Sequence, residues 1–63
     1  MDIYTLQIRR VLEDLDKSIR VPTACWLFSD LYQLTDIEVR IRLSELQKED
    51  LIRIDNGGWI KIV

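Results

Sequence analysis

The stretch from residue 35 to residue 62, TDIEVRIRLSELQKEDLIRIDNGGWIKI, contains the signals that decide the fold. Thr35 and Glu38 have the spacing of a capping box, in which the threonine hydroxyl accepts the backbone N–H of the glutamate and the glutamate accepts that of the threonine. A helix is therefore predicted to begin here. The apolar residues that recur at the helical period form a seam facing the core: Val39, Leu43 and Leu46.

The apolar period changes from that of a helix to that of a strand after residue 51. Two short apolar runs, residues 52–54 and 59–63, flank a turn rich in asparagine and glycine, which is typical of a β-hairpin. With Asn56-Gly57 as its central pair, this turn places Ile54 opposite Trp59. We therefore expect a two-stranded hairpin directly after the helix.

Two further helices are predicted in the first half of the chain. Residues 2–17 have an apolar side at the helical period, formed by Tyr4, Ile8, Val11, Leu12 and Leu15. Pro22 lacks a backbone N–H and has a fixed φ, so we expect it to stop a helix, and residues 18–21 are predicted to form a one-bridge strand. Thr23 is expected to cap the next helix, which ends near Tyr32. The inward residues of that helix are expected to be Ala24, Leu27, Phe28 and Leu31.

The composition is that of one small globular domain spanning residues 1–63. A chain of this length buries only about 60% of its unfolded surface, which leaves little room for an enclosed active site. No nucleophile has a histidine partner, and no glycine-rich phosphate loop precedes a helix, so an enzyme is not expected. Cys25 is the only cysteine and histidine is absent, which excludes a disulfide within the chain and a metal site built from these residues. We expect a buried thiol and no cofactor.

The sequence also bears on location and on charge. No apolar run approaches the roughly 20 residues that span a bilayer, and the start of the chain lacks the pattern of a signal peptide. We therefore expect a cytoplasmic protein without a membrane partner. The formal charge of −2 opposes general affinity for nucleic acid, so any such binding depends on where the cations lie.

The order helix, short strand, helix, turn, helix, hairpin resembles the winged helix-turn-helix superfamily over essentially the whole chain. Members often carry a valine, leucines four and seven residues later, then a glycine followed by a leucine and a β-branched residue. The matching residues are Val39, Leu43, Leu46, Leu51 and Ile52, with Asp50 in place of the glycine. Aspartate tolerates the left-handed backbone of a helix end. The resemblance implies a mainly α fold of three helices with a small antiparallel hairpin, and suggests a small regulator of the bacterial, plasmid or phage type.

This resemblance implies that the third helix enters the major groove of double-stranded DNA. Arg40 can then contact a guanine, Ile41 a thymine methyl group, and Lys48 a phosphate. The predicted DNA-contacting residues, including those of the short hairpin wing, are Thr35, Asp36, Arg40, Ile41, Ser44, Lys48, Arg53 and Lys61. For each polar residue an ordinary solvated helix face is an equally open interpretation.

Exposed apolar residues support an alternative, a protein-interaction module. Ile37 and Ile41 form a branched apolar pair on the outer face of the third helix, which suits a protein partner better than a phosphate-lined groove. On the first helix, Ile3, Leu6 and Arg10 point away from the core and predict a homodimer contact, although exposure at a frayed helix end is equally open. Trp26 and Trp59 are expected to cover the core, with a ligand platform as the other possibility.

Overall fold

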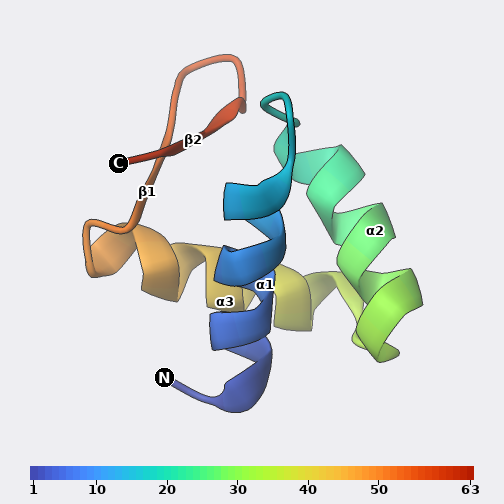
Figure 1. Cartoon of the computed structure of the whole chain (residues 1–63). Coiled ribbons are helices and arrows are strands. Elements are labelled where there is room, and N and C mark those ends of the chain that lie inside the picture. Colours follow the sequence, from blue (N-terminus) through green and yellow to red (C-terminus); the bar gives the residue numbers. More distant parts are fainter.

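Three helices precede a two-stranded antiparallel hairpin in the computed structural model, which describes residues 1–63. The elements are α1 (Ile3–Asp14), α2 (Val21–Tyr32), α3 (Asp36–Lys48), β1 (Ile52–Ile54) and β2 (Ile60–Ile62). Figure 1 shows α1 passing in front of α3, with α2 to one side and the hairpin rising from the end of α3. The predicted mainly helical fold with its small hairpin is confirmed. None of the helices has the length and apolar character needed to cross a membrane.

The start and end of α3 follow local signals in the sequence. Thr35 Oγ1 accepts the Glu38 N–H over 3.1 Å, and Glu38 Oε1 accepts the Thr35 N–H over 2.9 Å, so the capping box is present. The predicted seam of Val39, Leu43 and Leu46 is buried. Asp50 has a φ of 59°, in the left-handed region, and there it ends the helical path as expected.

The buried side of α1 differs from the prediction. The helix ends at Asp14 instead of residue 17, and Tyr4 is 39% exposed. Thr5 is fully buried instead. Its hydroxyl donates to Asp2 Oδ1 over 2.8 Å, so the core contains no unpaired hydroxyl group at this position. The Tyr4 ring lies at the rim, with its centroid 5.8 Å from that of Tyr32.

Helix α2 begins earlier than predicted. Val21 and Pro22 lie in its first turn, where a backbone N–H has no acceptor within the helix, so a proline disrupts nothing. Arg20, and not Thr23, therefore occupies the N-cap position, and no side chain caps the helix there. The predicted bridge is confirmed at Arg20, which pairs with Trp59, whereas Val21 of the predicted segment belongs to α2.

The inward face of α2 is turned toward α3, against which it packs. Cys25 is consequently a buried free thiol, as expected, and burial raises its pKa. Leu31, predicted to face the core, is 51% exposed. The helix ends near Tyr32 as predicted, and Gln33 after it takes a left-handed φ of 56°.

The hairpin register differs from the prediction by one residue. Ile54 pairs with Ile60, not with Trp59, and the second strand begins at Ile60. The cause is the turn: Gly58 adopts a φ of 82° and extends the loop from two residues to three. A shift of one residue moves every following side chain to the opposite face, so Trp59 points away from the core.

Candidate nucleic-acid interface

The surface of α3 opposite its buried seam is uncovered. Ile37 is 69% exposed and Ile41 is 58% exposed, and Ser44 and Lys48 are exposed beside them. These residues lie on one stripe because they recur at the helical period. The helical pattern in the sequence therefore predicted the exposure of this surface correctly, although it does not identify what the surface binds.

Arg40 lies on the flank of this stripe and is held by a neighbour. Its Nε donates to Asp36 Oδ2 over 2.8 Å, one turn earlier in the helix. The Arg40 hydrogen bond lowers the pKa of Asp36, so the carboxylate stays ionised at neutral pH. Exposed pairs of this kind contribute only about 0 to 1 kcal/mol, so a guanine or a phosphate can compete for the guanidinium at small cost.

A shallow groove of about 190 Å³ runs along this flank between α3, the start of α2 and β1. Its walls include Arg40, Ser44 and Gln47 from α3, together with Val21 and Ile54. Gln47 is absent from the predicted set, although its position seven residues after Arg40 places it on the same side of the helix. An amide at this place can donate to and accept from a base edge.

The hairpin residues of the predicted set lie on a different surface. Arg53 and Lys61 are direct cross-strand partners, and the alternation with buried Ile52 and Ile60 turns both side chains away from the core. The Lys61 ammonium is 3.6 Å from a carboxylate oxygen of Asp55. The predicted DNA-contacting residues therefore fall into two sets, one on α3 with its cap and one on the outer face of the hairpin.

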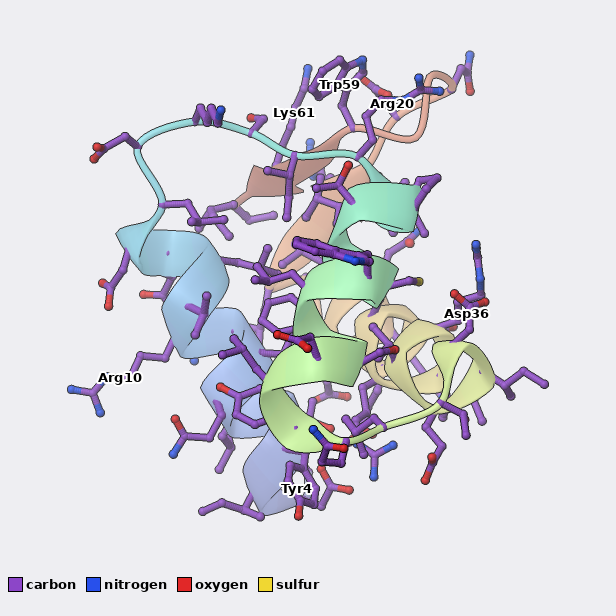
Figure 2. The ribbon with its side chains drawn as sticks, turned by 90° about the vertical axis from the view of Figure 1, so that its right-hand side faces the viewer. Tyr4, Arg10, Arg20, Asp36, Trp59 and Lys61 are labelled. Carbon is purple, nitrogen blue, oxygen red and sulfur yellow. The ribbon has the colours of Figure 1, made fainter.

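Neither tryptophan covers the core, so the prediction for both was wrong. Trp26 is 72% exposed on the outer side of α2, and Trp59 is 44% exposed. The Arg20 guanidinium lies 5.8 Å from the centre of the Trp59 ring. Figure 2 shows Trp59, Arg20 and Lys61 together at the top of the molecule, well away from Asp36 at the start of α3.

The outer side of α1 is also open. Ile3 is 64% exposed and Leu6 is 46% exposed, and Arg10 extends from the helix into solvent (Figure 2). These are the residues predicted to form a homodimer contact.

The two candidate surfaces differ in chemistry. The α3 surface has an aliphatic centre with one paired arginine on its flank, whereas the outer hairpin face combines cations with an indole ring. Comparisons with profiles of known protein families, with curated proteins and with solved structures find no match to this chain.

Proposed function

We propose that this protein is a winged helix-turn-helix regulator that binds double-stranded DNA in a sequence-specific manner through α3. The observation that carries the proposal is the uncovered flank of α3, where Arg40, Ser44 and Gln47 line one groove beside the start of α2. A helix in the major groove meets base edges with side chains of this kind at successive turns.

Each residue on this surface has a role in the proposed complex. Arg40 leaves Asp36 and makes a bidentate contact to a guanine, and Ile41 packs on a thymine methyl group. Ser44 bonds to a base edge, and Lys48, which has no ion-pair partner within the chain, neutralises a phosphate. The Thr35 cap lies near the phosphate backbone at the start of the helix.

The carboxylates at the start of α3 limit affinity and add selectivity. Asp36 and Glu38 both have a lowered pKa, the first through Arg40 and the second through the Thr35 N–H, so both are ionised at neutral pH. Each repels a nearby phosphate. In the free protein Asp36 orients the Arg40 guanidinium, and we expect binding only where a guanine replaces the bond that is lost.

The exposure of Ile37 and Ile41 favours a second candidate, docking of a protein partner on the same helix. Two uncovered branched side chains one turn apart gain free energy when a partner removes them from water. The two candidates make opposite predictions for salt, because contacts to phosphate release counterions and apolar contacts do not.

The test is a salt titration of binding to random duplex DNA, measured by fluorescence anisotropy for the wild type and three variants. Under the DNA proposal Lys48→Ala flattens the salt slope by about one. Arg40→Ala, measured on a selected duplex, costs about 1 to 3 kcal/mol and relaxes preference at one base pair. Arg9→Ala on α1, where the arginine pairs with Glu13 away from both candidate surfaces, is the matched control and should change neither the salt slope nor the affinity.

The outcome that contradicts DNA binding is equally specific. If Arg40→Ala and Lys48→Ala bind as the wild type does, α3 is not a DNA-reading helix. If Ile37→Ala alone then abolishes binding to a protein partner, with little dependence on salt, the α3 surface is a docking site.

A further inference from the structure

The outer face of the hairpin collects cations around an exposed indole. Trp59, just before β2, and Lys61 on β2 are two residues apart and therefore point to the same side. Arg53 lies directly across from Lys61 on β1, and Arg20 lies directly across from Trp59 on the other edge. Side chains from three separate segments thus meet on one surface, which no local pattern in the sequence marks.

The Trp59 ring is held in place although it is 44% exposed. Arg20 Nε donates to the Gly57 carbonyl over 2.9 Å, which fixes the guanidinium over the ring at 5.8 Å. A Cβ atom at Gly57 would lie 3.2 Å from Trp59 Cδ1, so the indole edge rests against the turn backbone. The ring is therefore positioned in the free protein, which lowers the entropy lost when a ligand stacks on it.

A hollow of about 270 Å³ lies beside the ring. Trp59 and Ile19 contribute its apolar surface, and Lys17 and Arg20 contribute its positive charge. Ser18 and Thr23, which both carry hydroxyl groups, line the same hollow. An indole, two cations and two hydroxyls are groups that can contact the base, the phosphate and the sugar of one nucleotide.

Charge is distributed unevenly over a chain whose formal total is −2. The cations on or beside this face are Lys17, Arg20, Arg53 and Lys61. Asp55 is the one carboxylate of the hairpin, and its Oδ2 lies 3.6 Å from the Lys61 ammonium. Its Oδ1 accepts the N–H groups of Gly57 and Trp59, both over 2.9 Å, and these bonds hold the turn. Glu13 and Asp16 line a neighbouring groove, which shares Lys17, Ser18 and Ile19 with this hollow.

We propose that the outer hairpin face binds single-stranded nucleic acid, with one base stacked on Trp59 and its phosphates on Lys17 and Arg20. An unpaired base offers its flat face to the indole, whereas the bases of a duplex are already stacked on one another. A surface for duplex phosphates needs the cations but gains nothing from a positioned tryptophan. This face shares no lining residue with the groove on α3, so single-strand binding here does not require that α3 binds DNA.

Trp26 provides a control for stacking on Trp59, because it is more exposed than Trp59 and does not line the hollow. In Trp26→Phe, the remaining fluorescence reports on Trp59, and in Trp59→Phe it reports on Trp26. The probe is a deoxythymidine oligonucleotide of about ten residues. We expect it to quench the emission of the Trp26→Phe variant and to leave the emission of the Trp59→Phe variant unchanged. Quenching of Trp26, or of neither ring, overturns the proposal.

Affinity measurements by anisotropy separate stacking from charge. Trp59→Ala should weaken binding of the oligonucleotide by about 5- to 150-fold, and Trp59→Tyr should restore most of the loss, since tyrosine also stacks. Lys17→Ala should lower the salt slope by about 0.7, the value for one phosphate of a single strand. Arg9→Ala on α1, which lies on neither candidate surface, should have no effect. Melting curves of each variant verify that it is folded.

Competition experiments identify other occupants of this face. If duplex DNA of the same length displaces the oligonucleotide at equal concentration and Trp59→Ala weakens neither, the face contacts phosphates alone and the stacking proposal is wrong. If a polyglutamate peptide competes as well as the oligonucleotide, the face recognises negative charge in general, which also contradicts the proposal.

Discussion

Arg42 on α3 donates a hydrogen bond to Asp2 before α1, with 2.7 Å between Nη2 and Oδ2. Asp2 is also the cap of α1, since its Oδ1 accepts the N–H and the hydroxyl of Thr5, both over 2.8 Å. The Arg42 guanidinium lies 5.6 Å from the centre of the Tyr4 ring. One carboxylate thus stabilises the start of α1 and joins it to the middle of α3.

This contact predicts a dependence of stability on pH. The Thr5 N–H, the Thr5 hydroxyl and Arg42 lower the pKa of Asp2 from 3.8 to about 2. Because the folded pKa lies below the unfolded one, the stabilisation is complete above about pH 5 and is lost as the pH falls through 3.8 toward 2. Thermal unfolding from about pH 7 to about pH 2 should therefore show a smaller loss of melting temperature for Asp2→Asn than for the wild type.

Asparagine retains the oxygen that caps α1 but removes the charge and the oxygen that accepts from Arg42, so this variant lacks the titration of Asp2. Asp14→Asn, at the other end of α1, is the control and should follow the wild type. Parallel curves for Asp2→Asn and the wild type would show that other carboxylates account for the acid response.

The buried seam of α3 predicts a large cost for one truncation. Leu46 is fully buried, and Leu46→Ala should reduce the free energy of unfolding by about 2 to 5 kcal/mol because it opens a cavity between helices. A domain of this size has little more than that to lose. Urea unfolding measures the change, with Ile41→Ala, at a residue 58% exposed, as the control of small effect. Equal stabilities of the two variants would contradict the packing of α3.

A side chain at the left-handed glycine of the turn should lower the stability of the protein through backbone strain and not through a steric clash. Gly58 has a φ of 82°, and an added Cβ would meet nothing nearer than Arg20 Nε at 4.0 Å. Gly58→Ala should therefore destabilise the protein by about 1 to 2 kcal/mol through backbone strain alone. Gly58→Asn should cost less, because asparagine tolerates this region. Urea unfolding that ranks alanine at or above asparagine would contradict the three-residue turn.

The open side of α1 predicts self-association. Ile3 and Leu6 are both exposed, and a regulator that binds palindromic sites needs two copies for tight binding. We expect a dimer at about micromolar concentration, and Leu6→Glu should convert it to a monomer by placing a charge in the contact. Leu31→Glu, at an exposed leucine of α2, should leave the dimer intact. Light scattering that finds a wild-type monomer at high concentration would remove α1 from this role.

Short-range signals determined much of this protein from sequence alone. The capping box of Thr35 and Glu38, the seam ending at Leu46 and the left-handed Asp50 each depend on residues within a few positions of one another, so the pattern predicts them correctly. The outer stripe of α3 follows by the same geometry. These features therefore account for α3 and for one of the two candidate surfaces.

The side chains that meet on the outer hairpin face were decided only by the tertiary structure. Several turns are possible around Asn56, and the observed turn uses Gly58 in a left-handed conformation. This turn allows two long-range hydrogen bonds, from Ile60 N to the Ile19 carbonyl and from Val21 N to the Gly58 carbonyl, both over 2.9 Å. Such bonds join segments about forty residues apart, which no local pattern encodes. Because a strand alternates its faces, this single choice of register buries Ile60 and turns Trp59 outward beside Arg20.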